Sequence, residues 1–295
     1  MSLKAHIQDV FSVIPLTFHI SKGKDDPNLT EFKKQYMQRK KSCMDNTWII
    51  KPGENSNRGK GIYIRESLEK ILKLVSSTGF HTFIVQKYIE RPLLINNRKF
   101  DIRCFAMMTC INGRVQGYFY KDGYVRTSSF EYTMQSKNRF IHLTNDAIQK
   151  NSEMYGKYEN SNKLSYDDLQ DYFDDRNMGI KFNDYILPQI RQTVAETFCA
   201  VYKKIDVKRK QHCFELFGYD FMIDQDFKVW LIECNTNPCL EESCELLGNL
   251  LSGLIENTFN LTIDPMFPPA SSTIKVSDWA NEFVGENKYE LLFSE

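Results

Sequence analysis

Near its C-terminal end the sequence carries two oxygen-bearing side chains at the end of an apolar stretch. Residues 230–238, WLIECNTNP, have the pattern of a β-strand that ends with Glu233 and Asn235 two residues apart. Side chains of a strand alternate between its two faces, so Glu233 and Asn235 are expected to point to the same side. The alternation places on one face Val229, Leu231, Glu233 and Asn235, and on the other Trp230, Ile232 and Cys234.

A third such side chain, Asp220, lies upstream in FELFGYDFMIDQDFKVW, which together with this strand is predicted to form a hairpin. If the hairpin turns near Gln225, Asp220 lies opposite or diagonal to Glu233 on the same face. Two carboxylates and the amide of Asn235 form an all-oxygen ligand set that suits Mg²⁺, with nucleotide phosphates completing its octahedron. The alternative is that Asp220 merely precedes a turn and that Glu233 is a strand-end charge in a salt bridge.

The segment RKFDIR repeats this pattern with charges of both signs. Its alternation predicts one face with Lys99, Asp101 and Arg103 and another with Phe100, Ile102 and Cys104. Two cations that flank a carboxylate suit phosphoryl transfer, which is catalysed mainly by positioning and charge neutralisation. A solvated charged face is the alternative, but the strand continues into CFAMMTC, which is typical of a protein core.

Two further segments carry groups that suit a nucleotide. Lys51 ends the apolar strand TWIIKPG, and the small-residue loop after it, whose N–H groups and cations would approach phosphates closely, contains Arg58, Gly59, Lys60 and Gly61. This loop matches neither the P-loop nor the dinucleotide motif, and a flexible surface turn is the alternative. The strand IVQKYI closes with Gln86 and Lys87, where free backbone groups at a strand edge and an amide would hydrogen-bond an adenine.

The composition indicates an ordinary globular chain. Its 295 residues include 38 Lys plus Arg and 38 Asp plus Glu, so no overall field attracts nucleic acid or an acidic membrane, and any acidic partner must meet a local patch. The eight cysteines show neither a C-x-x-C pair nor zinc spacing with histidine, which favours reduced thiols in a cytosolic protein. No secretory segment and no membrane span are expected.

Helices and hairpins are predicted around these strands. Apolar spacing in residues 66–77 and 184–205 favours amphipathic helices, the second with Pro188 in its first turn, and residues 240–259 form a final helix. Ser165 and Asp168 form a capping box. Residues 114–129 are predicted to form a hairpin that turns at residues 121–123, and the tail after Pro269 is expected to be a surface extension.

Six ordered motifs together resemble the tubulin tyrosine ligase-like family of ATP-grasp ligases, over roughly residues 15–268. They are WIIKPGENSNRGKGI, IVQKYIERPLL, RKFDIRCF, YVRTSS, IHLTNDAIQK and FGYDFMIDQDFKVWLIECNTNP. The resemblance implies an α/β (α+β) ATP-grasp fold, in which two lobes of mixed or antiparallel sheet with flanking helices close on ATP. The division that follows is a short N-terminal segment (1–45), a central subdomain (46–92), a C-terminal subdomain (93–268) and an extension (269–295).

The resemblance also assigns roles to residues by motif. The expected ATP contacts are Lys51, Arg58, Gly59, Lys60, Gln86, Lys87, Tyr88, Ile89, Thr144 and Asn145. Lys99, Asp101, Arg103 and Glu233 are expected to be catalytic, with Arg103 facing the γ-phosphate. Asp220, Glu233 and Asn235 match the family's Mg²⁺ ligands, and Arg126 and Lys163 match positions that hold the incoming amino acid. His142 is expected to support its loop rather than to shuttle protons.

The implied reaction uses Mg²⁺ and ATP to phosphorylate a carboxylate of the acceptor protein, after which the α-amine of a free amino acid displaces phosphate. The acceptor is expected to be a tubulin C-terminal tail on microtubules and the amino acid glutamate, in the cytoplasm and cytoskeleton or at the cilium and its basal body. A monomer that binds no nucleic acid and no membrane is expected. Candidates for a basic groove that meets acidic tails are Lys99, Arg126, Lys137, Arg139 and Lys163.

Several readings stay open. Glycylation and tyrosination use the same ATP site, and an inactive nucleotide-binding adaptor on microtubules or cilia and a ligase for another acidic protein are alternatives. The segment ECNTNP departs from the family's more usual E-V-N-x-S-P, which leaves substrate choice open at Thr236 and Asn237. The family's N-terminal lobe and basic extension are expected to be short or missing, either in a piece of a longer protein or in a minimal ligase that docks through a partner.

Overall fold

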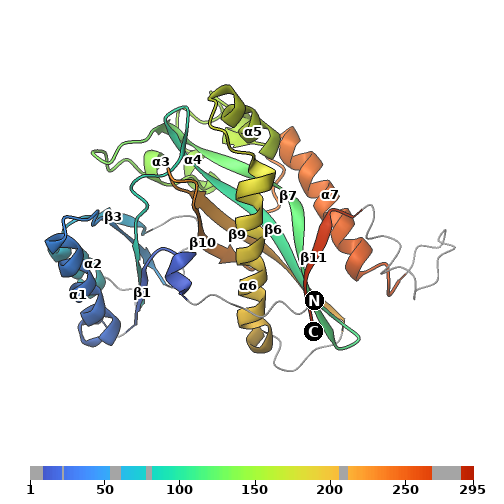
Figure 1. Cartoon of the computed structure of the whole chain (residues 1–295), viewed down its shortest axis with the longest axis horizontal. Coiled ribbons are helices and arrows are strands. Elements are labelled where there is room, and N and C mark those ends of the chain that lie inside the picture. Colours follow the sequence, from blue (N-terminus) through green and yellow to red (C-terminus); the bar gives the residue numbers. More distant parts are fainter. Residues whose placement is uncertain (1–8, 22, 54–60, 78–81, 206–211, 268–286) are drawn as a thin grey trace.

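The computed structural model describes residues 9–21, 23–53, 61–77, 82–205, 212–267 and 287–295. Within these residues the chain forms two antiparallel sheets with helices packed on them (Figure 1). The predicted α+β fold, with antiparallel sheets in two lobes and flanking helices, is confirmed. None of the eight cysteines, all of which lie in the described residues, forms a disulfide bond. In the described part of the chain, every helix is too short or too polar to cross a membrane.

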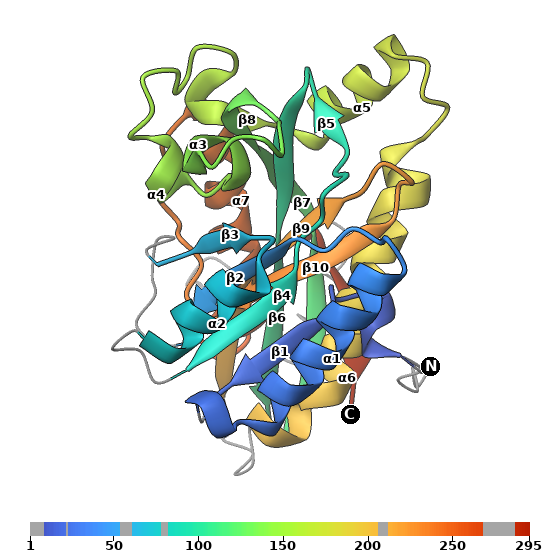
Figure 2. The same cartoon turned by 90° about the vertical axis from the view of Figure 1, so that its left-hand side faces the viewer.

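The smaller sheet has four strands in the order β1-β4-β2-β3. These are β1 (Thr17–Ile20), β4 (Phe83–Lys87), β2 (Trp48–Pro52) and β3 (Tyr63–Arg65), and helices α1 (Pro27–Lys41) and α2 (Leu68–Ser77) pack on one face of it (Figure 2). Helix α1 starts where the Asp26 carboxylate accepts the N–H of Asn28 at 2.8 Å. Phe32 of α1 meets Trp48 edge-on, with ring centroids 4.9 Å apart. The opposite face of this sheet is left for the functional site.

The larger sheet has the order β10-β9-β6-β7-β11, with two short strands added. Its members are β10 (Val229–Asn235), β9 (Cys213–Ile223), β6 (Arg98–Ile111), β7 (Arg114–Glu131), β11 (Tyr289–Ser294), β5 (Leu94–Ile95) beside β6, and β8 (Lys163–Leu164) beside β7. Helices α5 (Tyr166–Asp175) and α6 (Leu187–Ile205), the latter preceded by a π-helical turn (Phe182–Ile186), cover one face. Helix α7 (Glu245–Thr262) packs on the other face. Short helices complete the fold: α3 (Arg139–His142), α4 (Asp146–Gln149) and the 3-10 turns Val10–Ser12, Gly23–Asp25 and Asn160–Asn162.

The alternation predicted for β6 is confirmed. Phe100, Ile102 and Cys104 lie in the core beneath α5 and α6. On the other face, Phe105 and Met107 pack against α7, whereas Lys99 and Asp101 line the cavity and Arg103 pairs with Asp220. Although these three charged side chains are buried, their face is turned toward the smaller sheet, so the reading as a solvated charged face is wrong.

The predicted hairpin turn at residues 121–123 is wrong, because β7 runs without a break from Arg114 to Glu131. The turn lies earlier, at Asn112 and Gly113, whose φ angles of 52° and 77° fit a two-residue hairpin turn. Residues 120–122 form a bulge instead, since Cys104 pairs with Gly123 and Ala106 with Phe119. A side chain at Gly123 would lie 2.5 Å from the carbonyl oxygen of Arg103, so glycine is required at this bulge.

Other local predictions are confirmed with small shifts. The Ser165–Asp168 capping box starts α5, and Pro188 lies in the first turn of α6, where its missing N–H costs nothing. The final helix begins at Glu245 rather than at residue 240. Strand β1 pairs with β4, and β11 pairs with β7, so both terminal segments of the predicted division contribute a strand to a sheet. Whether that division describes independent units stays a prediction.

Candidate active site

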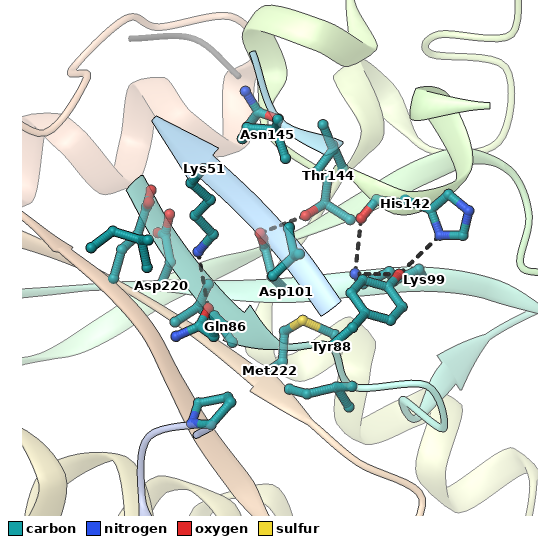
Figure 3. A pocket seen from close by; sticks show the side chains of 18 of the residues that line it. Lys51, Gln86, Tyr88, Lys99, Asp101, His142, Thr144, Asn145, Asp220 and Met222 are labelled. Carbon is teal, nitrogen blue, oxygen red and sulfur yellow. Dashed lines mark hydrogen bonds between the residues drawn. The ribbon is translucent and has the colours of Figure 1, made fainter. Parts of the chain in front are cut away.

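A cavity of about 430 Å³ lies between the two sheets, and it gathers most of the residues singled out in the sequence (Figure 3). Strands β2 and β4 of the smaller sheet form one wall, and β6, β7, β9 and β10 of the larger sheet form the other. The predicted site residues that line it are Lys51, Gln86, Lys87, Tyr88, Ile89, Lys99, Asp101, Arg126, Thr144, Asn145, Asp220, Glu233 and Asn235.

Five predicted site residues fall outside this lining. Arg103 lies directly behind it, because its guanidinium donates to the Asp220 carboxylate. Lys163 points elsewhere and donates to Asp146 Oδ1 at 2.6 Å, although its backbone pairs with that of Arg126. The remaining three, Arg58, Gly59 and Lys60, lie outside the described residues.

Lys51 is the cation that the smaller sheet contributes. Its Nζ donates to Gln86 Oε1 at 3.1 Å, while Gln86 Nε2 donates to Thr17 Oγ1 at 2.9 Å, so the amide orients the lysine. Burial lowers the pKa of Lys51, opposed by the charges of Glu233 and Asp220 across the cavity. Lys51 therefore faces the acidic wall of the larger sheet.

The expectation of free backbone groups at a strand edge near Gln86 is wrong, because β4 is an inner strand with partners on both sides. The N–H of Lys87 donates to the carbonyl of Leu16 at 2.8 Å, and that of Tyr88 to the carbonyl of Thr47 at 3.0 Å. The Lys87 ammonium itself forms an ion pair with Glu90 at 2.5 Å. These groups are consequently already hydrogen-bonded within the protein.

Lys99 is the most deeply buried cation of the cavity. Its Nζ donates to the carbonyl oxygen of His142 at 2.8 Å and to the hydroxyl of Tyr88 at 3.1 Å. Burial lowers the pKa of Lys99 to about 7, with the Asp101 carboxylate opposing this shift and Lys51 adding to it. An anionic ligand in the cavity would favour the charged form of this lysine.

Four charged residues form a continuous network on the larger sheet. Arg126 donates to both oxygens of Asp101, at 2.6 and 2.8 Å, and its Nη2 lies 2.8 Å from Asp220. Arg103 donates to both oxygens of Asp220, at 2.5 and 3.2 Å. These charges cancel within the network. Although burial opposes it, the two arginines hold the pKa of Asp220 far below its usual range.

A β-bulge in β10 decides which way Glu233 points. Leu231 pairs with Phe221, but Glu233 pairs with Asp220, so Ile232 is an extra residue in the ladder. The strict alternation predicted for this strand is therefore wrong: Val229 and Leu231 lie in the core, whereas Ile232, Glu233 and Asn235 line the cavity. The predicted pairing of Glu233 with Asp220 is confirmed, and the bulge makes it compatible with a buried Leu231.

The chemistry of this corner fits a hard divalent cation. Asp220 and Glu233 face each other, and Asn235 Nδ2 lies 3.2 Å from Glu233 Oε1. Burial raises the pKa of Glu233, as do the charge of Asp220 and a hydrogen bond to it; a cation between the two carboxylates would relieve this repulsion. Within the described residues no three His, Cys, Asp or Glu side chains form a metal cluster, so further ligands must come from an amide and a bound ligand.

Two contributions were missed at the sequence level. The first is the apolar part of the cavity lining, which suits a flat ring and includes Pro15, Ile49, Ile84, Met222 and Ile232. Strand alternation could have predicted Ile49 and Met222. Ile49 lies two residues from Lys51, and Met222 lies two residues from Asp220, each on the same strand. The second is Arg98, whose buried guanidinium is paired with Glu159 and donates to the carbonyl of Ser128 at 3.2 Å. It fixes the loop that precedes Lys163, and only tertiary contact reveals it.

The fold and this cavity define a two-lobed α+β protein whose central pocket sets lysines and arginines against a facing pair of carboxylates. The chain belongs to the tubulin-tyrosine ligase family, whose sequence profile matches residues 5–273. Among similar proteins, tubulin glycylase 3B of Drosophila melanogaster is 35% identical over 77% of this chain and 30% of its own length. The probable alpha-tubulin polyglutamylase Ttll1 of Tetrahymena thermophila is 31% identical over 84% of this chain and 61% of its own length.

A third relative carries a different description. The inactive polyglycylase TTLL10 of Homo sapiens is 32% identical over 74% of this chain and 35% of its own length. The chain thus spans between about a third and three fifths of the length of these relatives.

Proposed function

We propose that this chain is the catalytic part of an ATP- and Mg²⁺-dependent ligase that joins an amino acid to a glutamate side chain in the C-terminal tail of tubulin. The observation that carries the proposal is the buried set of Lys99, Asp101, Arg126, Asp220 and Arg103, which lies beside Glu233 at one cavity. Burying so many charges is costly even when they are paired with one another, and such buried charges beside a cavity are typical of a functional site. Membership in the family supports the same reaction class.

The proposed roles follow the position of each residue. The apolar part of the lining would hold the adenine, and Lys51 and Lys99 would bind phosphate oxygens, with Thr144 and Asn145 also in the lining. Asp220, Glu233 and Asn235 would hold Mg²⁺, which when bound neutralises the phosphate charge. Arg103, behind Asp220, would keep that carboxylate oriented and add positive potential toward the γ-phosphate.

The proposed reaction has two displacement steps. A carboxylate oxygen of the acceptor attacks the γ-phosphorus, and the bond to the β-γ bridging oxygen breaks, so ADP leaves and an acyl phosphate forms. The α-amine of the amino acid then attacks the acyl carbon, phosphate leaves with the bonding electron pair, and the amine gives up a proton. Neither step requires a side-chain nucleophile, because positioning and charge stabilisation, to which Lys99 and the arginines would contribute, are what such steps need.

A second cavity of about 910 Å³ offers a path for the acidic acceptor tail. It shares Ile62, His142 and Leu143 with the first cavity. Its charged lining consists of Arg65, Lys70, Lys137 and Arg139 against Glu66. Lys137 and Arg139 were candidates for a basic groove from the sequence. This excess of positive charge favours a polyanionic peptide, and screening by salt would weaken the attraction.

Glutamate and glycine are the two amino acids that the proposal includes. Glutamate is the expectation from the sequence, and the similar Tetrahymena protein is described as a probable polyglutamylase. Glycine is favoured by relatives described as tubulin glycylases, including glycylase 3A of Drosophila melanogaster, which is 36% identical over 76% of this chain. The proposed site of action is the microtubule cytoskeleton, including cilia.

Mass spectrometry of tubulin tests the proposal directly. The protein is incubated with Mg-ATP, tubulin and, separately, glutamate, glycine or tyrosine, and the tubulin mass is then measured. A ladder spaced by one residue mass supports the ligase and identifies its amino acid. If the protein binds nucleotide but adds no mass to tubulin, to microtubules or to other acidic proteins, the proposed ligase is rejected in favour of an adaptor.

A further inference from the structure

His142 stands between the two cavities and lines both of them. The residue ends the short helix α3, and its side chain is almost fully buried. Its Nδ1 lies 2.9 Å from the hydroxyl of Tyr88, on the nucleotide side (Figure 3). Its Nε2 lies 2.8 Å from the carbonyl oxygen of Ser136, which belongs to the lining of the second cavity.

The partners of His142 determine which nitrogen carries its proton. The carbonyl oxygen of Ser136 can only accept, so Nε2 must be the donor. Nδ1 of the neutral ring is then an acceptor, and the hydroxyl of Tyr88 must donate to it. This leaves a lone pair of the Tyr88 oxygen directed at Lys99, whose Nζ donates to it at 3.1 Å. The hydrogen bonds thus run in one direction, from Lys99 through Tyr88 to His142 and on to Ser136.

The consequence for Lys99 is a fixed orientation. An ammonium group has three donors, and two of them are directed to the hydroxyl of Tyr88 and the carbonyl of His142. The ammonium also lies 4.6 Å from the ring centroid of Tyr88, a cation–π contact. Within the described residues the third N–H has no hydrogen-bond partner, so it is left for a ligand in the cavity. Burial holds the pKa of His142 below its usual value, which keeps the ring neutral.

We propose that His142 is a positioning residue: as the neutral Nε2–H tautomer it orients the hydroxyl of Tyr88, which in turn directs the Lys99 ammonium at the nucleotide phosphates. The proposal rests on the proposed function only in naming a phosphate as the ligand of Lys99. It also links the phosphate site to residue 136 in the wall of the second cavity. His142 itself does not contact the reacting atoms.

Variants that keep one nitrogen position at a time test this chain of hydrogen bonds. In His142→Asn the amide oxygen can replace the Nδ1 acceptor, whereas His142→Gln places its amide near Nε2 and removes that acceptor. Calorimetry measures the affinity for ADP and for adenosine, and thermal melting monitors folding. We expect His142→Gln and Tyr88→Phe to weaken ADP binding about tenfold, the loss of roughly one hydrogen bond to a charged group, and to leave adenosine binding unchanged.

The His142→Asn variant distinguishes a positioning role of His142 from a purely structural role. His142→Asn should bind ADP within about threefold of the wild type, and the Tyr88→Phe/His142→Gln double variant should be no weaker than Tyr88→Phe alone, because both act through one hydroxyl. Equal losses for Asn and Gln, additive effects, or equal loss of ADP and adenosine would overturn the proposal. These binding results do not depend on whether tubulin is modified, so failure of the ligase assay is a distinct outcome.

If the variants do not fold, a measurement on the unchanged protein still tests the proposal. Long-range ¹H–¹⁵N spectra of histidine-labelled protein report the tautomer of His142 directly. The Nε2–H form at pH 7 supports the proposal. A ring that carries its proton on Nδ1, or on both nitrogens, would contradict it, because Tyr88 could then no longer donate to His142.

Discussion

Arg126 and Asp101 form a two-point ion pair, with Nε and Nη2 of the arginine 2.6 and 2.8 Å from the two carboxylate oxygens. Both side chains are buried, and Asp101 also accepts a hydrogen bond from Thr144 at 2.5 Å. The carboxylate is therefore well supplied with donors, and the guanidinium is held between Asp101 and Asp220. An arginine fixed in this way can meet an incoming anion without having to be ordered first.

Removing this arginine should destabilise the fold as well as impair the reaction. Arg126→Ala leaves Asp101 and Asp220 as buried charges with too few partners, and we expect the free energy of unfolding to fall by about 3–5 kcal/mol. Urea denaturation measures the loss. Adding Asp101→Asn to Arg126→Ala should recover part of the lost free energy of unfolding, because one unpaired charge disappears. A loss below about 1 kcal/mol for Arg126→Ala would show that the network does not contribute to stability.

Arg126 should also affect substrates unequally. In protein that is still folded, Arg126→Ala is expected to raise the KM for the amino acid more than the Kd for ATP. The reason is that the sequence motifs predict a role for this guanidinium in holding the incoming amino acid. Kinetics at 15 °C with saturating and limiting amino acid provide the comparison, together with nucleotide binding by calorimetry. Equal losses in both would count against that assignment.

Glu233→Gln should abolish ligation while the fold is retained. The change removes one charge at nearly constant volume, and it also removes both the burial of that charge and its repulsion with Asp220, which together raise the pKa of Glu233. We expect turnover to fall at least about 100-fold, as for other losses of a preorganised charge at a reacting centre, and thermal stability to stay equal or to rise. Cys234→Ser, on the neighbouring residue, is the matched control and should change turnover little. Unchanged turnover in Glu233→Gln would reject the metal assignment.

Nucleotide binding should take up a proton near pH 8. The pKa of Lys99 is lowered to about 7 by burial, so at pH 8 the free protein carries this lysine mostly neutral, and bound phosphate favours the charged form. ADP affinity should therefore decrease as the pH rises above 7. Calorimetry in buffers of different ionisation enthalpy counts the proton. Lys99→Arg, which keeps its charge, should show no such uptake; the same uptake in that variant would place the titrating group elsewhere.

A buried hydroxyl offers a test of the packing against β7. Tyr166 Oη has no hydrogen-bond partner within the described residues, and it lies where a side chain on Gly123 would otherwise be. Tyr166→Phe should keep the free energy of unfolding or raise it by up to about 2 kcal/mol, because an unsatisfied polar atom is removed. Tyr289→Phe is the control and should lower it by about 1 kcal/mol, since that hydroxyl is hydrogen-bonded to Thr258 at 2.9 Å. A clear loss in Tyr166→Phe would mean that its hydroxyl has a partner.

The second cavity should bind acidic peptides through its charge. Reversing Lys137 and Arg139 to glutamate is expected to weaken binding of a polyglutamate peptide at least about tenfold at low salt, while ADP affinity changes less than twofold. Fluorescence anisotropy at several ionic strengths measures this, and the salt dependence should be smaller in the variant. Lys34→Glu and Lys181→Glu, on exposed surfaces elsewhere, provide a charge-matched control. Equal weakening in that control would show a nonspecific effect.

Sequence patterns predicted those parts of the site that depend on local order. Alternation along β6 found Lys99, Asp101 and Arg103, because the pairing of this stretch with β7 has a continuous register from Phe100 to Cys104. The pairing of Asp220 with Glu233 also followed, since a hairpin fixes which residues face each other. The turn at Asn112 and Gly113 was detectable, because Asn-Gly is the strongest short hairpin signal, but Asp122 and Gly123 offered a competing one.

Features that depend on tertiary contact were not predictable. The bulge at Ile232 has no marker such as glycine, and only the need to bury Leu231 while exposing Glu233 to the cavity explains it. The ion pair of Lys163 with Asp146 joins residues 17 positions apart in an irregular segment. The contact between Arg98 and Glu159 likewise spans 61 positions. No periodicity connects such residues.

The extra residue in β10 also has an evolutionary consequence. A deletion of one codon at Ile232 would make Leu231 and Glu233 neighbours that still point to opposite faces, so both could keep their partners Phe221 and Asp220. A homologue of unchanged length that lacks the bulge would instead pair Ile232 with Asp220 and turn Glu233 to the core face, so it would lose its proposed metal site while every ligand is still present in its sequence. Inventories of conserved residues would score such a protein as active, and only the pairing of β10 with β9 would reveal the difference.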